Sequence, residues 1–217
     1  MTRLRNKAAD AAATENPDDR RLALEGIIAE SDQLIRTFNA LLMISRVEAG
    51  AVAAEMSVVN LSAIVEDSAE LYGPVAEEAG LALDCAIESD ISVNGNRELI
   101  GQAIFNLLDN AIKYSEGCGQ SIHLSLKREG RQAVFVVADN GPGIPPSRMD
   151  DVKQRFFRLD ESRSKPGTGL GLSLVDAVAS MHGGAFSLVE AGSLVEGYSG
   201  LAAVLRFAIV SEKGSAG

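Results

Sequence analysis

The sequence DNGPGI occupies residues 139–144, and GTGLGL occupies residues 167–172. A basic, aromatic segment, KQRFFR, lies between them at residues 153–158. Glycine allows the backbone to approach a ligand closely and to adopt positive φ angles, and a glycine loop that opens a helix directs free backbone N–H groups at an anion. Residues 139–172 are therefore interpreted as one wall of a nucleotide site with a flexible cover. Either glycine cluster alone would be a weak signal.

The composition limits the class of protein. The 217 residues, 46% of them apolar, are enough for one or two domains with a proper core. A net charge of −10 makes nucleic acid and anionic membrane poor general partners, because both are negatively charged. Cys85 and Cys118 lack CxxC spacing and indicate neither a metal site nor a disulfide framework. Since the apolar runs are too short to cross a bilayer, we expect a soluble, cytoplasmic piece without membrane contact.

A broad apolar stripe runs through residues 20–49. Its members recur at three-, four- and seven-residue spacings: Leu24, Ile27, Ile28, Leu34, Ile35, Phe38, Leu41 and Leu42. This pattern predicts a long helix that packs against other helices in a bundle. Residues 3–13 resemble the end of another helix but are too short to cover the stripe, so either the chain dimerises here or part of the bundle is missing. Gly50 fits a helix C-cap, and residues 49–55 are interpreted as a linker.

A second domain is expected to begin near Met56, with strands and helices interspersed. Asn60 or Ser62 would cap its first helix, and Pro74 would kink it. The expected elements are a strand at 57–59, a helix to 79, a strand at 81–87, a turn at 94–96, a helix at 97–114, a strand at 121–127 paired with one at 132–138, a helix at 169–181 and a final hairpin of 184–190 with 201–209. Ile122, Leu124 and Leu126 alternate along the strand at 121–127. On the helix at 97–114, spacing assigns to the inner face Leu99, Ala103, Ile104, Leu107, Leu108 and Ala111. Helices able to cover one face of a sheet predict an α/β sandwich rather than a doubly wound sheet.

A polar stripe lies on the helix predicted at 97–114. Asn106, Asn110 and Lys113 share one side at spacings i, i+4 and i+7. Two amides and an ammonium group could hold a hydrated Mg²⁺ and meet polyphosphate oxygens. Taken by itself, the same pattern is more simply a solvent-facing polar stripe.

Asp139 ends a strand immediately before the first glycine turn. A carboxylate there can accept a hydrogen bond from an exocyclic amine, which would select adenine over guanine; the alternative is an ordinary Asp-Asn-Gly turn. Five basic residues crowd into positions 153–165, between the glycine clusters: Lys153, Arg155, Arg158, Arg163 and Lys165. Charge runs usually mark a solvated face, but this location favours phosphate contact for at least one of them.

Four segments together resemble a known family. NLLDNAIKY at 106–114, DNGPGI, RFF and GTGLGL, in this order and spacing, resemble the asparagine, first glycine, phenylalanine and second glycine boxes of the sensor histidine kinases, which belong to the GHKL ATPase superfamily. The resemblance covers about residues 56–209, and residues 41–50 resemble the last part of that family's dimerisation and phosphotransfer hairpin. It implies an α+β fold: a two-layer α/β sandwich, the Bergerat ATP-binding fold, preceded by a truncated helical hairpin. The implied domains are residues 1–50, a partial hairpin, and residues 56–210, the ATP-binding catalytic domain.

The resemblance also implies roles for individual residues. Asn110 would ligate Mg²⁺ with Asn106 beside it, Lys113 would approach the phosphates of ATP, and these three would form the catalytic set. Tyr114 would lie near the ribose or adenine, and Asp139 would bind the adenine amine. The base pocket and the phosphate cradle would be completed by Gly141, Gly143, Ile144, Gly167, Thr168, Gly169, Leu170 and Gly171. Phe156 and Phe157 would anchor the cover, and the candidates for the γ-phosphate contact are Arg155, Arg158 and Lys165.

One feature of the family is missing from this sequence. The family's phosphoacceptor is a histidine in an H-E/D-x-x-T/N-P box, whereas this chain has only His123 and His182, neither in such a box. His123 is expected on the outward side of a strand, and His182 at a helix C-terminus as a cap. Because residues 1–6 resemble what normally follows the box, we expect the chain to begin just after the phosphoacceptor segment; upstream residues without a His-containing box would contradict this.

The resemblance implies the catalytic part of a histidine protein kinase. The γ-phosphoryl of ATP would pass to a histidine and then to an aspartate on a response regulator receiver domain, and the full-length protein would form a homodimer through the hairpin, with a membrane anchor expected upstream. An alternative is a GHKL-type ATPase; those enzymes use a glutamate base at the position of Asn106, and an amide cannot take a proton. A further alternative is a non-catalytic ATP-binding or dimerisation module that regulates a partner.

Overall fold

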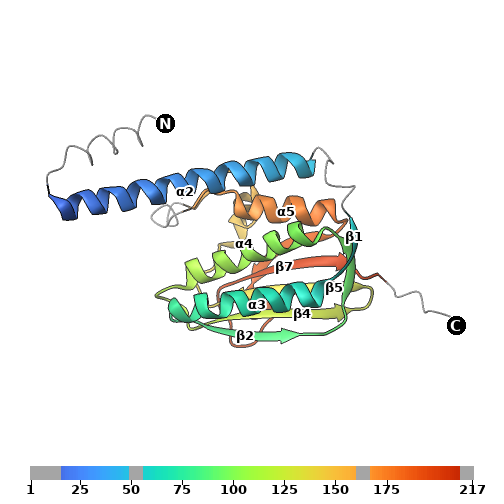
Figure 1. Cartoon of the computed structure of the whole chain (residues 1–217). Helices are drawn as coiled ribbons and strands as arrows, with labels where there is room; N and C mark the ends of the chain where they lie inside the picture. Colours follow the sequence, from blue (N-terminus) through green and yellow to red (C-terminus); the bar gives the residue numbers. More distant parts are fainter. Residues whose placement is uncertain (1–15, 49–55, 160–166, 211–217) are drawn as a thin grey trace.

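The computed structural model describes residues 16–48, 56–159 and 167–210. The helix end expected at 3–13, the Gly50 cap, the 49–55 linker, Arg163 and Lys165 all fall outside these ranges. Figure 1 shows a sheet covered on one face by helices, with a long helix above them. Within the described ranges, no helix is long and apolar enough to cross a membrane.

In the described part of the chain, a five-stranded sheet has the strand order β2-β4-β5-β7-β6. The strands are β2 (Ala82–Ile87), β4 (Ser121–Glu129), β5 (Gln132–Asp139), β6 (Ala185–Glu190) and β7 (Leu201–Ala208). β2 and β4 pair in parallel, and the other pairs are antiparallel. The alternation read from the sequence holds in β4, where Ile122, Leu124 and Leu126 are buried. The predicted β4–β5 pair and the pairing of the last two strands are confirmed.

Three helices cover one face of this sheet: α3 (Leu61–Glu78), α4 (Arg97–Ser115) and α5 (Gly171–Met181) (Figure 1). The apolar residues that spacing assigned to the inner face of α4 are all buried, namely Leu99, Ala103, Ile104, Leu107, Leu108 and Ala111. Asn60 caps α3, because its side-chain oxygen accepts a hydrogen bond from the Ala63 N–H at 3.0 Å, and α3 continues through Pro74. The predicted two-layer α/β sandwich is confirmed.

The turn expected at residues 94–96 is wrong. Asn94 and Gly95 belong to β3 (Ser92–Gly95), which pairs antiparallel with β1 (Ser57–Asn60), while Asn96 is the N-cap of α4. Pairing with β1 overrides the local turn preference of an Asn-Gly-Asn sequence.

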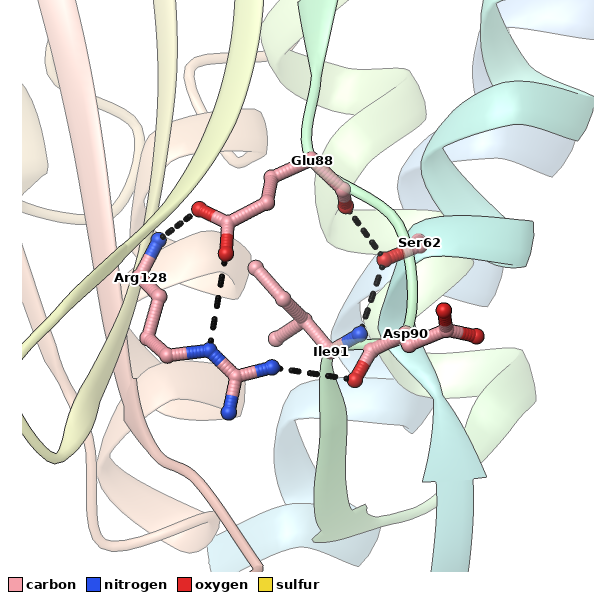
Figure 2. Close-up of polar contacts among 5 residues, drawn as sticks. All are labelled: Ser62, Glu88, Asp90, Ile91 and Arg128. Atoms are coloured by element: carbon pink, nitrogen blue, oxygen red, sulfur yellow. Dashed lines mark hydrogen bonds and ion pairs between the residues drawn. The ribbon is translucent and has the colours of Figure 1, made fainter.

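Hydrogen bonds hold the connection between β2 and β3 (Figure 2). The Ser62 hydroxyl donates to the Glu88 carbonyl oxygen at 2.7 Å and accepts from the Ile91 N–H at 3.1 Å. The Arg128 N–H donates to the Glu88 carboxylate at 2.8 Å, and its guanidinium donates to the Asp90 carbonyl oxygen at 3.2 Å. These contacts stabilise a connection in which Asp90 has a φ of 59°. The Ser62 hydroxyl is therefore used to hold residues 88–91, and Asn60 rather than Ser62 caps α3.

A second, smaller apolar cluster lies on the other face of the sheet. Val134, Val136 and Val204 pack there under the connection between β6 and β7. The connection contains a short 3₁₀ helix (Ala191–Ser193), and Tyr198 contributes to the cluster. The β6–β7 pair is therefore joined by a folded segment rather than by a tight turn.

The long helix predicted at 20–49 is observed as α2 (Pro17–Glu48). Most of its apolar stripe is exposed, including Ile28, Ile35 and Phe38, the last with 62% of its surface accessible. Near its C-terminal end, Ile44 is 1% exposed and belongs to the main core, where α2 contacts α5 (Figure 1). The helix thus packs against the sandwich at one end and leaves its remaining apolar stripe uncovered among the described residues.

Candidate functional site

A cavity of about 1170 Å³ opens between α4, α5 and the ends of β5 and β7. Most of the residues predicted from the sequence line it: Asn106, Asn110, Lys113, Tyr114, Asp139, Gly143, Ile144, Phe157, Arg158, Gly167, Thr168, Gly169 and Gly171. Gly141 and Leu170 adjoin the lining without forming it, and Lys165 lies outside the described residues. The amides, the carboxylate and the glycine loops, which are far apart in the sequence, therefore line one cavity.

Several lining residues were not predicted from the sequence. The apolar floor comes from Val137 on β5 and from Leu201 and Ala203 on β7. Val137 could have been found, because it lies two residues before Asp139 and so faces the same side of the strand. Met43 of α2 and Cys118 of the α4–β4 loop also line the cavity, and the sequence contains no signal for either.

Asp139 is held rigidly at the end of β5. Its Oδ1 accepts hydrogen bonds from the Gly141 N–H at 2.9 Å and the Leu201 N–H at 3.1 Å. A side chain on Gly200 would collide with this carboxylate. Burial raises the pKa of Asp139 above its ordinary value, and the backbone hydrogen bonds from Leu201 and Gly141 offset this in part. Because both donors meet Oδ1, the second oxygen, Oδ2, remains to accept from a ligand.

The two amides of α4 face the start of α5. Asn106 donates from Nδ2 to the Gln102 carbonyl oxygen at 2.9 Å, so its Oδ1 points away from the α4 backbone. A Cβ placed on Gly171 would lie 3.3 Å from Asn106 Oδ1 and 3.7 Å from Asn110 Nδ2. The absence of a side chain at Gly171 therefore lets α5 begin directly against both amides. Amide oxygens are hard ligands of the kind that Mg²⁺ accepts, and a protein often supplies only one or two of them beside phosphate and water.

Two basic side chains, those of Arg158 and Lys113, lie close to Gly167. Arg158 donates to the Gly167 carbonyl oxygen at 2.9 Å. The Lys113 ammonium lies 2.7 Å from where a Cβ on Gly167 would be, and 3.2 Å from the Tyr114 hydroxyl. The nearby N-terminus of α5 has no side-chain cap at Leu170, so the backbone N–H groups of its first turn are available to an anion. Two cations and a helix N-terminus at one end of the cavity suit phosphate groups.

The segment between the glycine clusters closes back on the second cluster. The Phe156 N–H donates to the Gly169 carbonyl oxygen at 2.8 Å, and Gly169 has a φ of 71°. A Cβ on Gly169 would lie 2.8 Å from the Phe157 carbonyl oxygen, so the contact needs glycine. Phe157 lines the cavity and packs against the core, whereas Phe156 is 59% exposed. Of the other basic residues, Lys153 pairs with Asp150 at 2.8 Å.

Neither histidine lies in the cavity lining. His182 is the C-cap of α5, as expected, and it also contacts α4. His123 is half-buried, with its ring centroid 5.7 Å from that of Tyr198. Burial lowers the pKa of His123, and Asp84 partly opposes this effect.

The chain is similar to known proteins in sequence and in fold. The model of the histidine kinase-, DNA gyrase B-, and HSP90-like ATPase family matches residues 95–207. The chain is 31% identical to the sensor-like histidine kinase SenX3 of Mycolicibacterium smegmatis over 179 residues, which are 82% of this chain, and it spans 46% of that protein's length.

Two solved structures are similar to the chain. A mycobacterial sensor histidine kinase, MprB, matches with a TM-score of 0.61 and 30% identity, covering 71% of this chain and 97% of that one. Full-length ShkA in complex with AMPPNP matches with a TM-score of 0.72 and 24% identity, covering 96% of this chain and 43% of that one. The second likeness concerns the fold alone.

Proposed function

This chain belongs to the histidine kinase-, DNA gyrase B-, and HSP90-like ATPase family, and from that premise we propose that it is the ATP-binding catalytic part of a two-component sensor histidine kinase. The observation that carries the proposal is the meeting of Asp139, the α4 amides and the N-terminus of α5 around one cavity. The ATP-binding family and the likeness to histidine kinases support it. Because the chain spans less than half of its curated relative SenX3, the activity of the whole protein is part of the proposal.

The roles we assign follow from the chemistry of each end of the cavity. Asp139 accepts a hydrogen bond from the exocyclic amine of adenine, and the apolar floor packs against the base. Lys113, Arg158 and the first turn of α5 bind the phosphate chain. Asn110, with Asn106 beside it, would hold Mg²⁺, which would supply neutralisation of the phosphate charge. The protein's own contribution is positioning and exclusion of water.

In the proposed reaction an imidazole nitrogen attacks the γ-phosphorus of ATP. The bond from phosphorus to the β–γ bridging oxygen breaks in line, and ADP leaves with that electron pair. The histidine comes from a phosphotransfer hairpin, since both histidines of this chain lie outside the cavity lining. A response regulator receiver domain then takes the phosphoryl group on an aspartate.

The two alternatives differ from the kinase in testable ways. A GHKL-type ATPase needs a general base for water, and the amide of Asn106 cannot act as one, so we expect slow hydrolysis of ATP by the isolated chain. A non-catalytic binding module would bind ATP and transfer nothing.

Transfer to a supplied hairpin tests the proposal. Incubated with γ-labelled ATP and a separate helical hairpin that carries the family's histidine box, the chain is expected to label the hairpin and to remain unlabelled itself. A hairpin whose histidine is replaced by alanine is the matched control. ATP binding without any transfer would contradict the kinase assignment. Label on His123 or His182 would contradict the expectation that this chain does not phosphorylate itself.

The exposed stripe on α2 supports a further part of the proposal. Ile28, Ile35 and Phe38 lie uncovered along it, and an apolar stripe of this kind is buried in helical bundles. We assign residues 1–50 to a partial dimerisation and phosphotransfer hairpin and residues 56–210 to the catalytic domain. In the full-length protein the hairpin would form a homodimer. The net charge of −10 argues against nucleic acid as a partner, and a cytoplasmic location is proposed for this portion.

The two cysteines allow a direct footprint of the nucleotide. Cys118 lines the cavity and is exposed, whereas Cys85 is exposed on β2 away from it. ATP at about ten times its Kd is expected to slow alkylation of Cys118 by iodoacetamide about tenfold, because only the empty fraction reacts. Alkylation of Cys85 should continue at an unchanged rate. The rates are read by mass spectrometry of the two peptides, and equal rates at Cys118 with and without ATP would place the nucleotide elsewhere.

A further inference from the structure

His182 connects the last turn of α5 to the first turn of α4. Its Nδ1 lies 2.7 Å from the Val178 carbonyl oxygen, and its Nε2 accepts a hydrogen bond from the Asn96 N–H at 3.0 Å. A carbonyl oxygen can only accept, so Nδ1 must carry the proton. A backbone N–H can only donate, so Nε2 must be unprotonated. The two partners therefore select one neutral tautomer.

The ring has little room to move. A Cβ on Gly95 would lie 2.7 Å from His182 Cδ2, so only glycine fits beside it. On another side the Phe207 ring packs edge-on, with centroids 5.8 Å apart. The half-buried imidazole thus contacts β3, the N-cap of α4, α5 and β7, and it forms a fixed connection between the two helices.

The helices that His182 joins are the two that carry the phosphate end of the cavity. Asn96, which donates to His182, also caps α4 by accepting from the Leu99 N–H at 3.1 Å. At the other end of the same helix pair, Gly171 begins α5 against Asn106. Because helices transmit displacement along their length as rigid rods, the contact at His182 constrains the contact at Gly171.

We propose that His182 is a positioning residue for the nucleotide site: its neutral imidazole ties α5 to α4 and so fixes the placement of the second glycine loop against the α4 amides. This inference rests on the proposed function. His182 touches neither the nucleotide nor the transferred phosphoryl group; it acts through Asn96 and Val178.

The electrostatic surroundings agree with a neutral ring. Burial lowers the pKa of His182, and the hydrogen bond to Val178 partly opposes this. The charged residues of the adjoining elements are Arg97 and Glu98 in the first turn of α4, Asp176 on α5 and Arg206 on β7. No charge is among the causes of the shift, and Arg97 is paired with Asp67 at 2.6 Å.

Two substitutions separate the two hydrogen bonds. In His182→Gln the longer amide can place an acceptor where Nε2 lies, whereas in His182→Asn the shorter amide keeps a donor for Val178 and cannot reach Asn96. Val136→Ala is the matched control, because it removes buried apolar surface from the opposite face of the sheet and so lowers stability without touching α4 or α5. ATP affinity is measured by calorimetry at pH 7.5, with the folded fraction of each variant checked by circular dichroism.

We expect His182→Asn to weaken ATP binding about fivefold, the population shift that loss of one hydrogen bond produces, while His182→Gln and Val136→Ala stay within about twofold of the original chain. An unchanged affinity in His182→Asn, or an equal loss in Val136→Ala, would overturn the positioning role alone. Absence of ATP binding by the original chain would instead overturn the proposed function, and the inference with it.

The pH dependence of stability gives an independent readout. Since the folded pKa of His182 is lowered, its contribution is present above the ordinary histidine pKa of about 6.5 and is lost as the pH falls below that value. The free energy of unfolding of the original chain should therefore fall more steeply below about pH 6.5 than that of His182→Gln, which cannot titrate. Equal pH dependence of the free energy of unfolding in the two proteins would contradict a neutral His182 that connects α5 to α4.

Discussion

Replacement of Asp139 by asparagine is expected to reduce the affinity of the chain for ATP about a hundredfold or more, because a site built to accept a hydrogen bond would then present a donor. The amide oxygen of the Asp139→Asn variant can still accept from the Gly141 and Leu201 N–H groups, as Oδ1 of Asp139 does. The amide nitrogen would then occupy the place of Oδ2 and face the amine of adenine. Because both groups are donors, no hydrogen bond could form between them.

The same substitution should not lower stability. The folded pKa of Asp139 is raised, so at neutral pH its ionised form makes the fold less stable than a neutral group would. Removing the charge while keeping the acceptor should leave the free energy of unfolding unchanged or slightly higher. Lost binding with retained stability separates a functional carboxylate from a structural one.

Asp84→Asn is the matched control for this prediction. Asp84 is an exposed carboxylate on β2 that accepts from the Tyr198 hydroxyl at 2.8 Å, and it lies outside the cavity lining. Its replacement should leave ATP affinity unchanged. If calorimetry found the two variants equally able to bind ATP, the assignment of Asp139 to the adenine would be wrong.

The second large effect is expected from Asn110→Ala. Loss of this amide should reduce phosphoryl transfer to the supplied hairpin about a hundredfold, because a bound Mg²⁺ would depend on this protein ligand and the charge it supplies would be needed most in the transition state. ATP affinity measured with and without Mg²⁺ should also become nearly equal, since the protein would no longer hold the ion. The base pocket is untouched, so metal-free ATP binding should persist.

Asn94→Ala is the control for Asn110→Ala. Asn94 is an exposed asparagine on β3 and does not line the cavity. This control variant should transfer phosphate at the original rate. Transfer by Asn110→Ala at that same rate, measured with γ-labelled ATP, would exclude Asn110 as the metal ligand.

Periodicity predicted most of the fold because the elements that carry it are long or strictly alternating. α4 shows every inward residue that its spacing assigned, from Leu99 to Ala111. The short strand β3 was missed because four residues ending in Asn94-Gly95 hold too little periodicity, and their pairing with β1 is a long-range contact. The folded segment between β6 and β7 was missed for the same reason: it is fixed by burial of Val136 and Val204 from other strands.

The candidate site was predictable where a residue type is needed for its chemistry. Asp139 and Asn110 were singled out because DNGPGI and NLLDNAIKY resemble two boxes of the sensor histidine kinases. By themselves, a carboxylate before a turn and an amide on a helical stripe have commoner structural uses. The contribution of Met43 was hidden, since it depends on how α2 packs against α5. The sequence predicted one of the two structural roles of His182. Its place as the C-cap of α5 could be expected, but the hydrogen bond that it accepts from the Asn96 N–H could not.

The central claim is that this chain binds ATP in the cavity between α4 and α5 through a metal ion and an adenine-selective carboxylate. Calorimetric titration of the purified chain with ATP and with GTP, each with and without Mg²⁺, tests it most directly. We predict saturable binding of ATP that Mg²⁺ strengthens and GTP does not reproduce. Absence of saturable ATP binding, or equal binding of GTP, would contradict it.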